Sequence, residues 1–360
     1  MKKKFMYSVL LALMISCSNG SDDIAVQTNS NNNGNNNNPP SSEWLIPRNE
    51  VLDGGPGKDG IPSIDDPKFV DVFTQDFIND DDLVIGVNKN GTIKAYPHSI
   101  LNWHEIVNDK FSQELVTINY CPLTGTAFAW DSMSDGVTST FGVSGLLYNA
   151  NLILYDRNTD SYWSQLRLEC VSGELIGDEP TMVNLIQTNW LTWKTLYPNT
   201  LVLGTDTGFN RAYNVYPYGD YLTFQDFLIF PASPLNNTLP LKERVYSLID
   251  EDKSKVYQYS NFENGKVLID SFNEKQYLIV GNENLLKGFQ LAEDHVNLSF
   301  EYDFSFAGIL FKDNEGNRWT VFGEAISGPR TGQKLSPAKS VVSYWFAIAA
   351  FYRNPEIYSD

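Results

Sequence analysis

The stretch Leu115-Val-Thr-Ile-Asn-Tyr120, Cys121-Pro-Leu-Thr-Gly125, Thr126-Ala-Phe-Ala-Trp130 decides the fold class. Two runs rich in β-branched and aromatic residues flank a segment in which Pro122 fixes φ and Gly125 tolerates a positive φ, which predicts a strand, a turn and an antiparallel strand. Similar runs, bounded by Gly, Asn and Asp, lie at 83–87, 146–155, 201–204, 244–249, 255–259 and 306–311. We therefore expect a predominantly β protein with a few helices (α+β).

Two segments carry helix signals. Residues 97–108 begin with a proline, which helices tolerate in their first turn, and residues 189–197 end before Pro198. The apolar run 344–351 is too short to span a membrane and is expected to be buried. Because strands and helices do not alternate regularly, a Rossmann-like parallel sheet is not expected.

An internal repeat divides the chain. Phe141-Gly-Val-Ser-Gly145 is followed by Asp156, Trp163 and the run 169–173, in the same order as Phe304-Ser-Phe-Ala-Gly308, Asp313, Trp319 and the run 324–328. The strand-hairpin-strand pattern of 84–95 resembles that of 245–257. We predict two duplicated antiparallel β-rich halves near 80–185 and 240–340, joined by the segment that carries the second helix, with Cys170 facing Ala325 in the alignment.

Composition and charge limit the possible partners. Of 360 residues, 42% are apolar and 19% charged, which is typical of a packed globular protein. The 26 Lys and Arg against 44 Asp and Glu give a net charge of −18. Nucleic-acid binding depends on neutralising phosphates with basic side chains, so we expect no nucleic-acid partner.

The first 42 residues have the features of an exported lipoprotein. Lys2 to Lys4 precede an apolar run at 5–16, and Leu13-Met14-Ile15-Ser16-Cys17 resembles the box in which a cysteine is lipidated. We predict a signal peptide at 1–16, and at 17–42 a lipid anchor at Cys17 with an Asn-rich tether that has nothing apolar to bury. The globular region then spans 43–360. The expected location is the outer membrane, held by its lipid and facing outward.

Several motifs together resemble one protein family. They are Asp59-Gly-Ile-Pro-Ser-Ile-Asp65, Trp103-His-Glu-Ile-Val-Asn-Asp109, Tyr120-Cys-Pro-Leu-Thr-Gly-Thr126, Phe141-Gly-Val-Ser-Gly145, Tyr155-Asp-Arg-Asn-Thr-Asp-Ser161, Trp163-Ser-Gln165 and Pro217-Tyr-Gly-Asp-Tyr221. In this order they resemble domain-of-unknown-function family 3179, a group of mostly exported bacterial proteins. The resemblance supplies no activity. It does imply that position 121 carries selenocysteine in some relatives, and that many members have a second cysteine where this chain has Thr124.

Cys121 is the candidate reactive residue. At a turn, backbone N–H groups and the Thr124 hydroxyl could donate to its sulfur, and we expect a partly exposed thiol with a lowered pKa. His104 shares the apolar side of the first helix and could act as a proton carrier beside Cys121. These three residues suggest a thiol-dependent oxidoreductase that needs no cofactor and acts on a small-molecule or thiol substrate, although a structural histidine and a buried structural cysteine remain open.

Other residues suggest binding functions. Asp156, Arg157, Trp163 and Gln165 could form the wall of a substrate pocket, or a hairpin ion pair with the tryptophan packed beneath it. The alternative function is a non-catalytic binding module. It would hold copper through Cys121 with His104 or His98, or a surface ligand such as a glycan through aromatic grooves.

Overall fold

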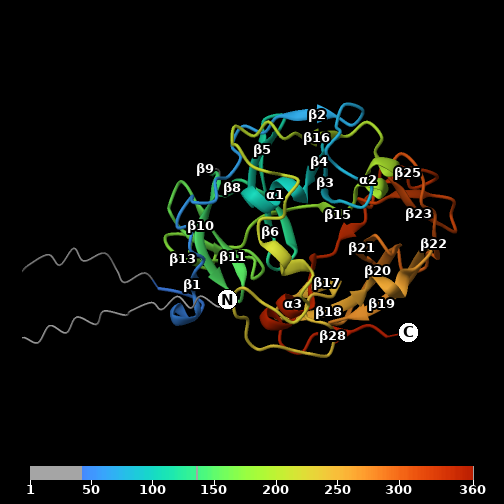
Figure 1. Cartoon of the computed structure of the whole chain (residues 1–360). Coiled ribbons are helices and arrows are strands. Elements are labelled where there is room, and N and C mark those ends of the chain that lie inside the picture. The colour runs from blue at the N-terminus through green and yellow to red at the C-terminus, as the bar shows by residue number, and fades with distance from the viewer. Residues whose placement is uncertain (1–42, 135–136, 360) are drawn as a thin grey trace, which may run out of the picture. The chain divides into compact units, whose positions relative to one another are not determined.

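The structure, a computed structural model, describes residues 43–134 and 137–359. These residues form one compact unit that is mostly β, and most of the strand pairs are antiparallel, which confirms the predicted class (Figure 1). The helices found there are α1 (His98–His104), α2 (Trp190–Leu196) and α3 (Trp345–Phe351), with short 3-10 helices η1 (Arg48–Glu50), η2 (Gly219–Leu222) and η3 (Tyr259–Phe262).

The N-terminal half contributes three main sheets. The first has the order β15 (Leu185–Asn189), β3 (Leu83–Lys89), β4 (Thr92–Pro97), β16 (Leu201–Leu203), β2 (Phe69–Asp71). The second has the order β14 (Met182–Val183), β7 (Thr126–Asp131), β6 (Glu114–Cys121), β5 (Ile106–Phe111). The third has the order β1 (Leu52–Asp53), β10 (Phe141–Tyr148), β11 (Asn151–Asp156), β12 (Tyr162–Ser164), β13 (Glu169–Ser172), and β8 (Met133–Ser134) pairs with β9 (Val137–Thr138).

The C-terminal half has matching sheets. Their orders are β27 (Ser340–Tyr344), β17 (Arg244–Asp250), β18 (Lys253–Gln258), β28 (Glu356–Ile357); then β19 (Lys266–Phe272), β20 (Lys275–Asn282), β21 (Leu285–Gln290), β26 (Ser336–Pro337); and β22 (Phe300–Tyr302), β23 (Ile309–Asp313), β24 (Arg318–Thr320), β25 (Ala325–Ser327). In each half one short strand pairs in parallel at the same place, β16 with β4 and β28 with β18.

This correspondence supports the predicted duplication. Trp163 pairs with Cys170 across β12 and β13, as Trp319 pairs with Ala325 across β24 and β25, with a register shift at the same point in both. The two indoles are buried. The matching pattern extends over 83–203 and 244–357, beyond the ranges expected, because α2 and α3 follow the equivalent strands β15 and β27.

The first predicted helix is shorter than expected. It ends at His104, because Glu105 adopts a φ of 57°, and the β-branched residues that follow enter β5, where Ile106 pairs with Asn119. The second prediction is confirmed within one residue: Asn189 caps α2 by accepting a hydrogen bond from the backbone N–H of Thr192 (3.0 Å). Gly86 of β3 lies beneath α2, where any side chain would collide with the Trp193 ring.

Two strand predictions are wrong in detail. The run 146–155 is a hairpin, because Asn149 and Ala150 both take positive φ and turn the chain between β10 and β11. The run 306–311 begins with a turn at Ala307 and Gly308, so β23 starts only at Ile309. In both places a local turn interrupts a sequence that is otherwise typical of strands.

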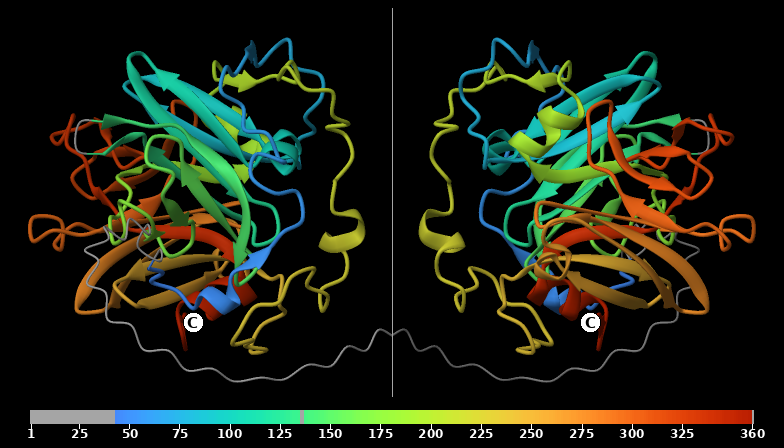
Figure 2. Two further views of the ribbon diagram at one scale, coloured as in Figure 1. Left: turned by 90° about the vertical axis from the view of Figure 1, so that its left-hand side faces the viewer. Right: turned by 90° about the vertical axis from the view of Figure 1, so that its right-hand side faces the viewer.

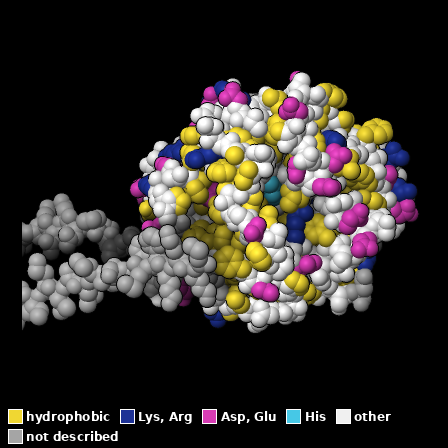
Figure 3. Space-filling view, in the orientation of Figure 1, with side chains coloured by type: hydrophobic (Ala, Val, Ile, Leu, Met, Phe, Trp, Pro, Cys, Tyr) yellow, Lys and Arg dark blue, Asp and Glu magenta, His cyan; other side chains and the backbone are white. Residues whose placement is uncertain are grey.

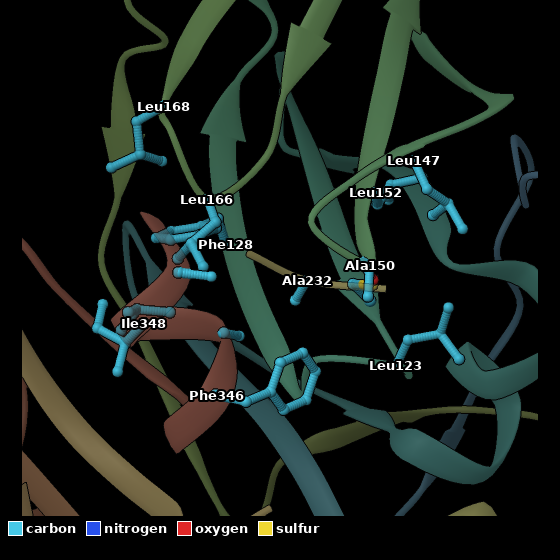
Figure 4. Packing of buried hydrophobic residues seen from close by; sticks show 14 of the residues in the cluster. Leu123, Phe128, Leu147, Ala150, Leu152, Leu166, Leu168, Ala232, Phe346 and Ile348 are labelled. Atoms are coloured by element: carbon cyan, nitrogen blue, oxygen red, sulfur yellow. The ribbon is translucent and has the colours of Figure 1, made fainter. Parts of the chain in front are cut away.

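The largest core cluster joins the two halves. It includes residues of β6, β7, β10, β11 and β12 from the first half, and of α3, β17 and β27 from the second. Figure 4 shows Phe346 and Ile348 of α3 on one side of this cluster, with Leu147, Ala150 and Leu152 on the other. The 344–351 run is thus the buried segment that was expected, and it forms α3.

A long irregular segment connects the halves. Residues 205–243, here called the strap, contain only η2 as regular structure and run along one side of the molecule (yellow in Figure 2). Its side chains Tyr216, Tyr218, Leu228 and Phe230 pack against the core cluster. Irregular segments of this length are uncommon in compact domains and often cover functional sites.

Candidate functional site

Cys121 ends β6, and a four-residue turn leads to Thr126 at the start of β7. This turn contacts the second half, because the backbone N–H of Tyr344 donates to the Thr124 carbonyl (2.8 Å) and the Tyr344 ring lies over Gly125. Cys121 is only 1% exposed and belongs to the core cluster. The expectation of a partly exposed thiol is therefore wrong: the strap and the second half cover the turn.

The surroundings of the sulfur favour the neutral thiol. Burial first, and then the charge of Glu105, raise the pKa of Cys121 to about 11, so the expected lowering of this pKa is also wrong. The thiol donates to the Ala150 carbonyl (3.7 Å). Hydrogen bonds from the Thr124 hydroxyl and the backbone N–H groups of Thr124 and Leu152 act in the opposite direction and lower this pKa, as the turn geometry predicted.

Glu105 is the ionisable neighbour of Cys121. It follows α1 in a left-handed backbone conformation, and its carbonyl accepts from the N–H of Tyr120 (2.7 Å), the residue before Cys121. Its side chain is buried, and this burial raises the pKa of Glu105 to about 7, although the Tyr218 hydroxyl donates to its Oε1 atom (3.0 Å). A carboxyl that titrates near neutral pH can accept or release a proton at the pH of most cells.

The strap is hydrogen-bonded to the residues around this pair. Trp103 Nε1 donates to the Val215 carbonyl (3.0 Å), His104 contacts the Tyr213 hydroxyl (2.7 Å), and Tyr218 binds Glu105. Three successive residues at the end of α1 thus each bind the strap. Tyr221 then donates to the carbonyl of Leu123 in the cysteine turn (2.7 Å).

A small cavity adjoins Glu105. Its volume is about 60 Å³, and Glu105, Leu123, Leu152 and Tyr218 are among its lining residues. Leu123 and Leu152 also belong to the core cluster that contains Cys121. This space could hold about two water molecules but no larger substrate.

A buried polar network lies behind the cysteine turn. The Asn151 amide donates to Thr124 (2.9 Å), Thr126 (3.0 Å) and Gln165 (2.8 Å), and Gln165 donates to Asn119 (2.9 Å). The hydroxyls of Thr124 and Thr126 are 2.8 Å apart, and Thr126 also donates to Gln165. If the Thr126 hydroxyl donates to Thr124 and not to Gln165, the hydroxyl hydrogen of Thr124 is free to bond the sulfur of Cys121. Two hydrogen-bond arrangements of one network therefore suit the two protonation states of the thiol.

The two helix histidines have separate environments. His104 Nδ1 lies 2.8 Å from the Pro62 carbonyl, so this nitrogen carries the proton and Nε2 accepts from Tyr213. His104 thus holds the strap, and both of its nitrogens are engaged away from Cys121. His98 is buried, and burial, followed by the charge of Arg244, lowers the pKa of His98 to about 3. A copper ion bound at His98 would meet the same repulsion from Arg244.

Figure 3 shows a histidine side chain and a basic side chain next to each other in a recess near the centre of the face on which α1 lies in Figure 1. Within the described residues, no group of three or more His, Cys, Asp or Glu side chains could hold a metal ion.

The four residues expected in a pocket wall do not converge. Asp156 accepts from the backbone N–H of Thr159 (2.8 Å) and from Trp163 Nε1 (3.2 Å), which ties the hairpin turn to the buried indole. Asp156 and Trp163 line a cavity of only about 40 Å³. Arg157 instead donates to Asp65 (2.9 Å), and Gln165 is buried in the network described above.

Sequence reasoning missed Glu105 and Tyr218. Both lie in motifs that carried the family resemblance, the first beside His104 and the second in the run 217–221. The sequence signal for Glu105 was an acidic residue next to the apolar side of the first helix, where burial would raise the pKa of its carboxyl. Cys17 and the predicted signal peptide and tether lie outside the described residues.

Comparisons with known proteins give one match. Residues 58–356, most of the chain, match the model of a family described as "Protein of unknown function (DUF3179)". No curated protein and no solved structure matches the chain. Among the described residues, no helix is long and apolar enough to cross a membrane.

Proposed function

The chain belongs to the DUF3179 family of proteins of unknown function, and from the chemistry of its residues we propose that it is a thiol-dependent oxidoreductase acting through Cys121. The observation that carries this proposal is that Cys121 and Glu105 are both buried beneath the strap, with the carboxylate close enough for its charge to raise the pKa of the thiol. Buried ionisable groups with shifted pKa values that meet at one place are typical of functional sites.

The proposed reaction is thiol–disulfide exchange with an external disulfide. Glu105 takes the proton of Cys121, and because the carboxyl becomes neutral, its charge no longer opposes the thiolate. The thiolate sulfur attacks one sulfur of the substrate and forms a mixed disulfide, and the departing thiolate takes the proton from Glu105. The thiol is latent in the closed conformation, so the strap must move before a disulfide can reach Cys121. Thr124 stabilises the thiolate, and His104 acts as a positioning residue through Tyr213.

The test compares two tyrosine variants. Tyr218→Phe removes the hydrogen bond between the strap and Glu105, and Tyr257→Phe removes a similar bond from Tyr257 to Asp270 (2.9 Å) in the second half. The lost hydrogen bond should reduce the free energy that holds the strap over Cys121 by about 1 kcal/mol. We therefore expect roughly fivefold faster release of thiopyridone from 2,2′-dithiodipyridine in Tyr218→Phe, with no change in Tyr257→Phe. Mass spectrometry should locate the adduct on Cys121. If native Cys121 reacts no faster than the buried Cys170 in any of these proteins, the proposal is wrong.

The same proposal includes anchoring to the outer membrane through a lipid on Cys17. It is supported by the basic start, short apolar run and cysteine box of the first 17 residues. Cells that express the wild type should incorporate labelled palmitate into this chain, whereas Cys17→Ala should not. Equal labelling of the two would remove this part of the proposal.

A second candidate function is glycan binding, favoured by an aromatic groove of about 510 Å³. Phe306 is 74% exposed there, and polar side chains accompany it, among them Asn88, Asn199, Thr320 and Glu324. Exposed rings beside hydrogen-bonding groups suit sugar rings, which have an apolar face and a polar edge. Phe306→Ala should weaken binding of a soluble oligosaccharide panel at least tenfold, whereas Phe224→Ala, an exposed aromatic of the strap, should not.

A further inference from the structure

A pocket of about 270 Å³ lies at the junction of the two halves. Its walls come from corresponding elements of the halves: β7, β14 and β15 from the first, and β21, β26 and β27 from the second. The strand registers align Leu185 with Ser340, since each pairs with the equivalent residue of β3 or β17. The pocket therefore lies where the two copies of one fold face each other.

The two copies differ in chemistry at this pocket. Counting from the equivalent hairpins, Phe128 of β7 corresponds to Lys287 of β21, and Gln187 of β15 corresponds to Val342 of β27. All four side chains line the pocket. Of these four side chains, each half thus contributes one that is apolar and one that is polar. The pocket contains a single buried amine, which lies beside apolar walls.

Lys287 is poorly compensated for a buried lysine. It is 5% exposed, and its Nζ atom donates to Asn184 Oδ1 and to the Leu185 carbonyl (3.2 Å). An ammonium group has three N–H donors, so one remains without an acceptor among the described residues. None of the described Asp or Glu side chains forms an ion pair with it, and burial lowers the pKa of Lys287 to about 7.

A second buried polar atom in the pocket wall lacks a partner. The Nε2 atom of Gln187 donates to the Gly125 carbonyl (3.0 Å), but its Oε1 atom is buried without a hydrogen bond. An incompletely bonded buried cation is costly unless an acceptor occupies the space, whereas the Gln187 Oε1 atom needs a donor such as a water molecule. The apolar walls limit that occupant to a molecule that is mostly hydrocarbon.

We propose that this pocket binds a small apolar carboxylate, whose charged oxygens pair with Lys287 while its hydrocarbon part contacts the apolar wall. A carboxylate supplies the missing acceptor and the missing negative charge at once. A cavity of this volume accommodates a chain of about six to eight carbons, below the usual size of drug-like ligands. This site is separate from Cys121 and does not depend on the proposed thiol chemistry.

The test is calorimetric titration of the full chain with octanoate and, separately, with 1-octanol. Lys287→Met keeps the length of the side chain and removes the charge, so octanoate should bind at least tenfold more weakly, while the weak binding of octanol should not fall. Lys339→Met is the matched control, because Lys339 lines the same pocket but is paired with Glu179 (3.3 Å); its effect should stay below threefold.

A second readout covers the possibility that Lys287→Met alters folding. The NMR titration of the wild-type Lys287 side chain should shift to higher pH when octanoate is bound, because a negative neighbour stabilises the ammonium form. Octanoate that binds wild type and Lys287→Met equally, or that does not bind the wild type at millimolar concentration, would overturn the proposal. An unchanged Lys287 titration in the presence of bound octanoate would do so as well.

Discussion

The β6–β7 connection of the first half and the β20–β21 connection of the second occupy the same place in matching sheets, yet only the first contains a cysteine. β6 and β7 are joined by Pro-Leu-Thr-Gly after Cys121, whereas β20 and β21 are joined by Glu283 and Asn284 alone. The longer turn reaches the core between the halves, and the strap covers it. The shorter turn makes an ordinary hairpin.

Features that both halves share have a different character. In each half a buried tryptophan donates its indole N–H to an aspartate that also organises a turn, Trp163 to Asp156 (3.2 Å) and Trp319 to Asp313 (2.8 Å). The framework common to both halves therefore serves folding. The groups found in one half only, the cysteine turn and Glu105, are the ones to examine for function.

The largest expected effect tests the shared framework. Trp163→Ala and Trp319→Ala should each lower the free energy of unfolding by about 3–5 kcal/mol, because each removes a large buried ring and leaves a cavity. Urea denaturation followed by circular dichroism measures both. A loss below about 1 kcal/mol in either variant would mean that the two tryptophans do not play equivalent roles.

The next prediction concerns a charge found in the first half. The pKa of Glu105 is about 7 in the folded protein against 4.5 for an ordinary glutamate, so the folded state holds the proton more tightly between these values. Stability contributed by this group is therefore lost as the pH rises from about 4.5 to 7, by about 3 kcal/mol in total.

Glu105→Gln should remove this loss. The measurement is the difference in unfolding free energy between wild type and variant at several pH values, which cancels the contribution of His98. That contribution has the opposite sign, since the lowered pKa of His98 makes stability rise between about pH 3 and 6.5. A difference between wild type and Glu105→Gln that does not change with pH would show that Glu105 titrates normally.

A smaller effect is expected in the polar network. Gln165 corresponds to Val321 of the second half, counted from the equivalent tryptophans, and both are fully buried. Gln165→Leu would make the first half resemble the second, but it would leave the side-chain oxygen of Asn119 without its donor and take one acceptor from the Thr126 hydroxyl. The expected loss of stability is about 1–3 kcal/mol in urea denaturation. A more stable variant would imply that the network is kept for the thiol site alone.

The sequence predicted the strands well because their β-branched and aromatic runs are local signals. The expected repeat, which depends on fixed spacing along the chain, is supported by the matching pairs Trp163 with Cys170 and Trp319 with Ala325. The hairpin at Asn149 and Ala150 was missed, because positive φ at an alanine has no signature in composition. The burial of Cys121 was missed because it depends on Tyr344 and on the strap, which are distant in sequence. A turn predicts conformation, but only tertiary packing decides exposure.

The smallest expected effect belongs to Arg157, which stood in the strongest part of the family resemblance. Its guanidinium donates to Asp65 Oδ2 (2.9 Å) and Ser63 Oγ (2.7 Å), and its side chain remains 30% exposed. Because exposed ion pairs gain little in water, Arg157→Ala should cost no more than about 1 kcal/mol. The reaction of Cys121 with 2,2′-dithiodipyridine should not change, since Arg157 binds the 63–65 segment and not the strap. If Arg157→Ala slows that reaction severalfold while stability is preserved, Arg157 contacts the substrate, and the pocket-wall interpretation of this residue is the correct one.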